Sequence, residues 1–126
     1  RLTKQIKFIE HCKDMALAYK VSDIVVSASI EPEAFGRIAV EAQSMEKLII
    51  ASNIGGSNET INDEKTGFLF KSGDAKSLSM KIIQVLTMDE TNFNIIGKEG
   101  RKNVTKKFNV EKMCFSTYSE YKRLLN

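Results

Sequence analysis

The sequence contains little of the chemistry that marks metal centres, disulfide scaffolds or membrane spans. Its 126 residues include one histidine and two cysteines, Cys12 and Cys114, which match neither a zinc-ligand spacing nor a CxxC motif. We therefore expect two reduced thiols, as in a cytosolic protein, and no metal site. No apolar run reaches the roughly 18 residues that a transmembrane helix needs. The opening residues, RLTKQIKFIE, resemble the interior of a longer chain, so we expect a fragment.

The composition that remains is that of one globular domain. Hydrophobic residues make up 42% and charged residues 28% of the chain, which is ordinary for a soluble protein, and the length suits a single domain spanning 1–126. The net charge is only +3, and the lysines are spread out rather than grouped with aromatic residues, which argues against a nucleic-acid partner. We expect a cytoplasmic protein, with peripheral binding at the cytoplasmic face of a membrane left open.

Short apolar runs alternate with helical patterns along the chain. The expected strands are 6–9, 23–29, 47–52 and 66–70, and the expected helices are 14–21, 35–45, 74–88, 92–107 and 110–125. The continuous runs at 23–29 and 47–52 predict strands that are buried on both faces. This order predicts an α/β fold, a Rossmann-like parallel sheet with helices on both faces and further helices at the C-terminal end. Ligands of such sheets bind in the loops that follow the carboxyl ends of strands.

One such loop carries an unusual cluster of charges, in the stretch EPEAFGRIAVE from Glu31 to Glu41. Pro32, the only proline, marks the loop, and the helix that follows presents unpaired N–H groups, which suit an anion. A cation in the first helical turn, Arg37, opposes the helix dipole at a cost of roughly 0.3–1 kcal/mol. Either Arg37 meets an anionic ligand such as phosphate, or it pairs with Glu41 on the helix surface.

Glu41 lies among apolar residues of the same expected helix, so we expect it to be partly buried. A partly buried carboxylate needs hydrogen-bond donors, and vicinal sugar hydroxyls are suitable because a carboxylate accepts more than one donor. Glu33, in the loop before the helix, could bind a second sugar in the same way.

The segment EAFGRIAVE resembles the E-x7-E motif of retaining glycosyltransferases with the GT-B fold, whose usual form is E-G-F-G-x-x-x-x-E-A. Ala34 replaces the first glycine of that motif. The flanking segments IKFIEHCKDMALAYKVSDIVVSAS and KLIIASNIGGSNETINDEKTGFLFKSGD are similar to the family's segments in the same order, and the final helices resemble its C-terminal tail. The resemblance therefore covers nearly the whole chain and implies one half of a GT-B fold.

The resemblance implies a role for each matching residue. Glu33 would be the catalytic contact to the donor sugar, and Glu41 would hold the ribose. The residues implied to face the donor sugar and its diphosphate are Ala34, Phe35, Gly36, Arg37 and Ile38. The residues implied to line the nucleobase are His11, Cys12 and Met15, although a loop without ligand contacts is an equal alternative for His11 and Cys12.

Several residues depart from the family's pattern or extend it. Glu10 stands where the family has glycine and would bring a negative charge near the base, while Glu46 and Leu48 replace a glycine and a proline beside a strand. The family's GG-x-x-E segment is matched here by Gly55, Gly56 and Glu59. We expect the glycines to serve a turn and Glu59 to have no catalytic role.

The resemblance implies the C-terminal, donor-binding half of an enzyme that moves a sugar from a nucleoside diphosphate sugar to a glycan or lipid-linked acceptor, in lipopolysaccharide or other cell-envelope glycan synthesis. No cofactor or metal ion is implied. The first βα unit, with its diphosphate-binding arginine and lysine, and the N-terminal acceptor half have no counterpart in this sequence, so we expect the fragment to be inactive alone. The alternative is a non-catalytic nucleotide-binding or protein-interaction module. A receiver-like domain is disfavoured because the first expected strand ends in IEHC rather than in an acidic cluster.

Overall fold

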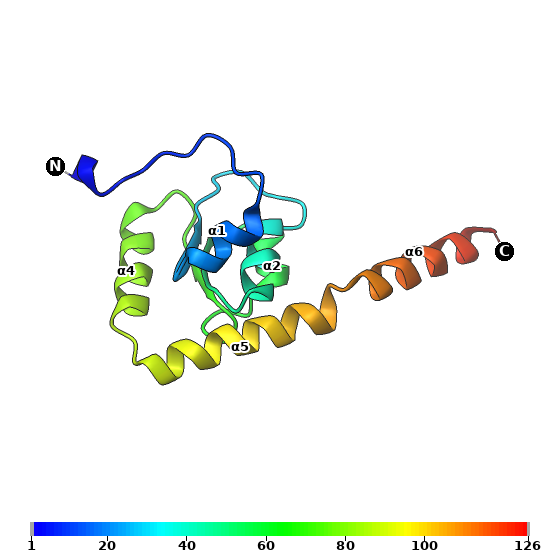
Figure 1. The fold of residues 1–126 in the computed structure, drawn as a ribbon. Helices are drawn as coiled ribbons and strands as arrows, with labels where there is room; N and C mark the ends of the chain where they lie inside the picture. The colour runs from blue at the N-terminus through cyan, green and yellow to red at the C-terminus, as the bar shows by residue number, and fades with distance from the viewer. Residues whose placement is uncertain (1, 126) are drawn as a thin grey trace.

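The computed structural model describes residues 2–125, and Figure 1 shows their arrangement. Three parallel strands form one sheet in the order β1-β2-β3, and helices flank it. This confirms the predicted Rossmann-like α/β class. The elements in chain order are η1 (Leu2–Lys4), α1 (Met15–Val21), β1 (Ile24–Ser27), α2 (Arg37–Ser44), β2 (Leu48–Ser52), α3 (Ser57–Thr60), β3 (Phe68–Phe70), α4 (Ala75–Leu86), α5 (Glu90–Lys107) and α6 (Val110–Leu125).

The central strand β2 has apolar side chains on both faces, and both faces are covered. Ile49 and Ala51 pack in one core with residues of α1 and α2, while Leu48 and Ile50 pack in a second core with residues of α4 and α5. Side chains alternate between the faces of a strand, so one continuous apolar run supplies both cores. The prediction of a strand buried on both faces is confirmed for β2, all of whose residues are buried.

Three helices start at a residue whose side chain caps them. Asp14, Asp74 and Asp89 are the N-caps of α1, α4 and α5, and each side chain accepts a hydrogen bond from a backbone N–H in the first helical turn. Aspartate suits this position because its carboxylate satisfies a donor that the helix leaves unpaired. All five expected helices are found within two residues of their predicted starts, and the short helix α3 was not anticipated.

The expected strand at 6–9 is wrong. The chain there has no regular structure, and Phe8 and Ile9 are 93% and 79% exposed. A strand needs a neighbour to complete its hydrogen bonds, and none of residues 2–125 pairs with this segment.

The prediction for 23–29 is partly wrong. Strand β1 covers only Ile24–Ser27, and Val26 is 42% exposed. Val26 pairs with Ile50 and shares its face of the sheet. The helices on that face, α4 and α5, pack mainly over β2 and β3. In the outer strand, Ile24 still packs against their core, whereas Val26 lies beyond it.

The last two helices lie differently against the sheet. Helix α5 packs along α2, and the Arg101 guanidinium donates to the Ser44 carbonyl oxygen at 2.6 Å. Helix α6 has no buried residue and extends away from the rest of the chain after Phe108 (Figure 1). Within residues 2–125, no helix combines the length and the hydropathy that a bilayer crossing requires.

Candidate functional site

The loops that follow the three strands meet at the carboxyl edge of the sheet. The Ser72 hydroxyl, after β3, donates to the Ser29 carbonyl oxygen, after β1, at 3.2 Å. The Ser29 hydroxyl donates to Glu33 Oε1 at 2.6 Å, and the Gly56 N–H, after β2, donates to the Glu33 carbonyl oxygen at 2.8 Å. Glu33 is therefore held at both its backbone and its carboxylate, at the edge where parallel α/β sheets bind ligands.

The glycine pair after β2 allows this convergence. A Cβ atom on Gly55 would lie 2.6 Å from the Glu33 carbonyl oxygen, and one on Gly56 would lie 2.3 Å from the Phe35 carbonyl carbon. Gly55 has φ +54, so it also serves the expected turn. Gly56 has φ −60, which any residue adopts, so its lack of a side chain matters for contact with the neighbouring loop. The sequence alone did not indicate that contact.

Helix α2 begins directly after this loop. Its N-cap, Gly36, has φ +75 and no side chain to cap the helix, so the first N–H groups stay available to water or to an anion. Arg37 is the first helical residue, and its side chain is 82% exposed. Ala34 is exposed, and Ile38 is 37% exposed.

The Glu41 carboxylate has a hydrogen-bond partner on each oxygen. Arg37 Nη2 donates to Oε1 at 3.1 Å, and the Tyr19 hydroxyl donates to Oε2 at 2.8 Å. The Glu41 side chain is 35% exposed, which confirms the expected partial burial. Of the two alternatives for Arg37, the structure shows the pairing with Glu41. Burial, and then the neighbouring Glu41 carboxylate, raise the pKa of Tyr19 to about 12.

Sequence reasoning did not single out Tyr19. It lies among the apolar residues of a short helix, where a tyrosine indicates core packing, and its ring is in fact buried at 4% exposure. Its bond to Glu41 joins residues 22 positions apart in the sequence. No local spacing pattern predicts a contact of that kind.

A depression of about 280 Å³ between α1 and α2 brings several of these residues together. Met15 lies in its wall with Tyr19, Arg37 and Glu41. His11 and Cys12 lie on the exposed segment before α1, and the Cys12 thiol donates to the Asp14 carbonyl oxygen. Among residues 2–125, no three histidine, cysteine or acidic side chains are grouped so that they could hold a metal ion.

Phe35 connects the loop before α2 with the far end of α5. Its ring meets the Phe108 ring edge to face, with centroids 5.4 Å apart and planes at 77°. Phe108 is the C-cap of α5, where the chain turns into α6. A hollow of about 490 Å³ lies beside this contact and is bordered by Val110 and Met113 of α6.

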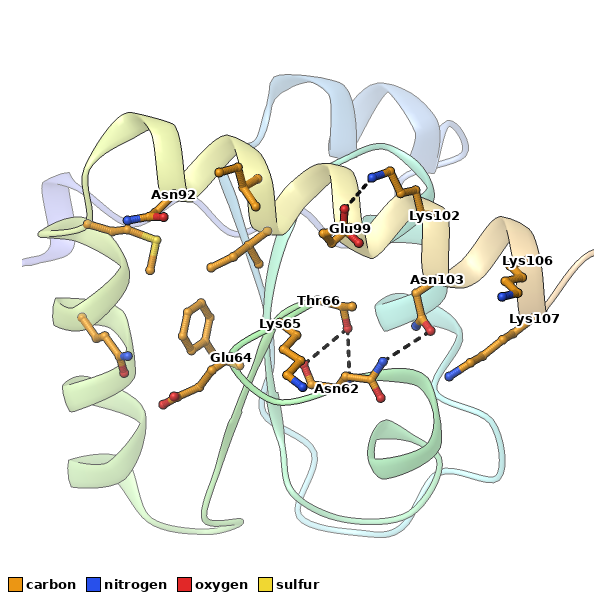
Figure 2. A pocket seen from close by; sticks show the side chains of 15 residues that line it. Asn62, Glu64, Lys65, Thr66, Asn92, Glu99, Lys102, Asn103, Lys106 and Lys107 are labelled. Atoms are coloured by element: carbon orange, nitrogen blue, oxygen red, sulfur yellow. Dashed lines mark hydrogen bonds and ion pairs between the residues drawn. The ribbon is translucent and has the colours of Figure 1, made fainter.

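A larger groove, of about 880 Å³, lies at the opposite edge of the sheet (Figure 2). It is bordered by α4, α5 and the turn at 62–67, which precedes β3 and so lies at the amino end of that strand. Its basic residues on α5 have local explanations. Lys102 pairs with Glu99, and Lys106 and Lys107 lie in the last turn of the helix, where cations complement the helix dipole. This groove is separate from the carboxyl-edge loops.

The fold and these loops define an α/β domain of the Rossmann-like class, whose carboxyl-edge loops converge on the start of a helix. The family model described as glycosyl transferases group 1 matches residues 1–106. The chain belongs to this family.

Individual relatives agree with this assignment. The capsular polysaccharide biosynthesis glycosyltransferase CapM of Staphylococcus aureus is 31% identical over 95% of this chain and 31% of its own length. A glycosyltransferase structure from Rickettsia africae has a TM-score of 0.90 and 38% identity, over 99% of this chain and 33% of that one. Anabaena HepE in complex with UDP-glucose has a TM-score of 0.73 and 27% identity, over 82% of this chain and 29% of that one. The chain thus spans about a third of the length of these relatives.

Proposed function

We propose that this chain is the donor-binding, C-terminal part of a retaining glycosyltransferase. The complete enzyme would transfer a sugar from a nucleoside diphosphate sugar to a glycan or lipid-linked acceptor of a cell-envelope polysaccharide. The observation that carries this proposal is the placement of two carboxylates, Glu33 and Glu41, on either side of the α2 N-terminus at the carboxyl edge. Family membership, the UDP-glucose complex of HepE and the capsular role in the name of CapM support it.

Glu33 is the proposed catalytic contact to the donor sugar. Its Oε1 accepts the Ser29 hydroxyl, and a carboxylate retains further lone pairs that can accept sugar hydroxyls. Because the Gly56 N–H also holds the Glu33 backbone, the side chain extends from a fixed point. A sugar bound there would lie against the backbone of Ala34, Phe35 and Gly36.

The start of α2 is the proposed diphosphate site. The first N–H groups of the helix and the helix dipole, at Arg37 and Ile38, favour negative charge. Arg37 would leave Glu41 and turn to the diphosphate, and this exchange is inexpensive because an exposed ion pair contributes about 0–1 kcal/mol. We propose that these groups, in place of a metal ion, balance the charge of the leaving nucleoside diphosphate.

Glu41 is the proposed ribose ligand, and the depression between α1 and α2 is the proposed nucleoside site. Met15 lies in the wall of that depression with Glu41 and is the nucleobase contact that geometry favours. His11 and Cys12 stay proposed as neighbours of the base, and their exposed segment lies next to Met15 in the chain.

The direct test measures donor turnover by the protein in its full natural length. Glu33→Ala should lower kcat at least about a hundredfold if Glu33 contacts the reacting sugar, while Glu41→Ala should mainly raise KM for the donor. Glu120→Ala removes an exposed carboxylate that pairs with Arg123 on α6 and serves as the control. Wild-type kinetics for both Glu33→Ala and Glu41→Ala would disprove the site.

A further inference from the structure

Tyr19 forms a bond that core packing alone does not require. Its ring is 4% exposed and belongs to the core that includes Ala42 of α2 and Ile49 of β2. A phenylalanine ring would bury nearly the same apolar area. The tyrosine hydroxyl instead reaches out of that core to Glu41 Oε2 at 2.8 Å, so the bond crosses from α1 to α2.

The two partners of Glu41 differ in how firmly they are held. Tyr19 is fixed by its packed ring, whereas the Arg37 side chain is 82% exposed. An exposed arginine exchanges its partner at little cost, but a buried hydroxyl that lost its acceptor would be left unsatisfied. A ligand that enters the depression can therefore replace Arg37 at Oε1 while Tyr19 still holds Oε2.

We propose that Tyr19 is a positioning residue, whose hydroxyl holds the Glu41 carboxylate so that Oε1 is presented to the ribose hydroxyls of a nucleoside diphosphate. This inference rests on the proposed function and adds to it a residue outside the E-x7-E segment. Without the hydroxyl, the flexible Glu41 side chain would have only the exposed Arg37 as a partner. The carboxylate would then be ordered only on binding, which weakens affinity.

The test separates an effect on the ribose from a general effect on folding. The full-length protein and its Tyr19→Phe variant are titrated by calorimetry with UDP, GDP and ADP, each beside its 2′,3′-dideoxy form. Wild type should prefer at least one ribonucleotide over its dideoxy form. Tyr19→Phe should lose about three- to tenfold of the affinity for that ribonucleotide, the scale of one hydrogen bond, and should bind the dideoxy form as wild type does.

Two variants serve as references for this measurement. Glu41→Ala should abolish the preference for ribose, because it removes the group on which Tyr19 acts. Tyr121 lies on α6 and is 65% exposed. Tyr121→Phe removes its hydroxyl and should leave the affinities for the ribonucleotide and for its dideoxy form unchanged.

The outcomes distinguish this inference from the proposed function. If wild type binds none of the three nucleotides, or if Glu41→Ala keeps the preference for ribose, the proposed function fails and the role of Tyr19 fails with it. If Glu41→Ala loses the preference but Tyr19→Phe keeps it, only the role of Tyr19 is overturned. An equal loss of affinity for both forms in Tyr19→Phe would show a purely structural residue and would also overturn it.

Discussion

The N–H of Gly56 donates to the carbonyl oxygen of Glu33 at 2.8 Å, and this bond joins the loop after β2 to the loop after β1. It places the backbone of the glycine pair directly against the residues that precede α2. The position of the proposed sugar contact therefore depends on a residue 23 positions later in the sequence that contributes no side chain.

Gly56→Ala should destabilise the protein by about 1–3 kcal/mol, the usual cost of forcing an extra carbon into a packed region. The new Cβ would lie 2.3 Å from the Phe35 carbonyl carbon, and the three nearest atoms all belong to the Phe35 backbone, which cannot move aside as a flexible side chain could. Chemical denaturation of wild type and variant measures the loss of unfolding free energy. The variant should also bind the donor more weakly than wild type.

Gly73→Ala is the matched control for this substitution. Gly73 has φ +73, but a Cβ there meets no atom within 4 Å, so alanine costs only the backbone strain of roughly 1–2 kcal/mol and should leave donor binding unchanged. Gly56, with φ −60, gives no such strain. A donor affinity equal to wild type in Gly56→Ala would contradict the role assigned to the contact between the two loops.

Arg37→Ala should change the free energy of unfolding by less than about 1 kcal/mol, because its pair with Glu41 is exposed. If Arg37 turns to the diphosphate, the same variant should bind the nucleoside diphosphate roughly tenfold more weakly, the scale of a charge-assisted hydrogen bond. The affinity for the nucleoside without phosphates should not fall. Calorimetric titration with both ligands measures the difference.

Arg123→Ala provides the comparison, since Arg123 also forms an exposed ion pair, with Glu120 on α6. It should leave both affinities at the wild-type value. If Arg37→Ala and Arg123→Ala bound the nucleoside diphosphate equally well, Arg37 would have no role in diphosphate binding and would only form an ion pair on the surface.

Stability should fall as the pH rises from about 10 to about 12, with Tyr19 as one cause. Its pKa is raised from 10.0 to about 12 in the folded protein, so the unfolded chain loses this proton first. A group whose pKa is higher in the folded protein than in the unfolded chain stabilises the fold fully at a pH below its unfolded pKa. That stabilisation is lost as the pH rises through the folded pKa. Tyr19→Phe should remove this part of the pH dependence.

The measurement is chemical denaturation at a series of pH values, beside an ultraviolet titration of tyrosine ionisation. Tyr118→Phe is the control, because residue 118 is 66% exposed. This substitution should leave the decrease of the unfolding free energy with pH as it is in wild type. If the unfolding free energy of Tyr19→Phe decreased with pH as steeply as that of wild type, the Tyr19 proton would not contribute to the pH dependence of stability.

Local patterns predicted much of the fold. The aspartates at 14 and 74 mark helix starts because a short carboxylate caps unpaired N–H groups. The apolar run at 47–52 predicted β2 because a run of that length is typical of a strand covered on both faces. The same reasoning failed at 6–9, which is apolar and β-branched but has no pairing partner within residues 2–125. The composition of a segment indicates that it could form a buried strand. Whether it forms one depends on a neighbouring strand with which it can pair.

For the site, the sequence by itself determined the positions of Glu33 and Glu41 around a helix start and the glycine pair that follows β2. Tertiary structure decided how they are held. Of the two chemically reasonable partners for Arg37, an anionic ligand and Glu41, the structure shows Glu41. It also brings Tyr19 to the same carboxylate and Gly56 to Glu33. These contacts join segments far apart in the chain, and short-range spacing carries no information about them because the packing of helices and strands sets such distances.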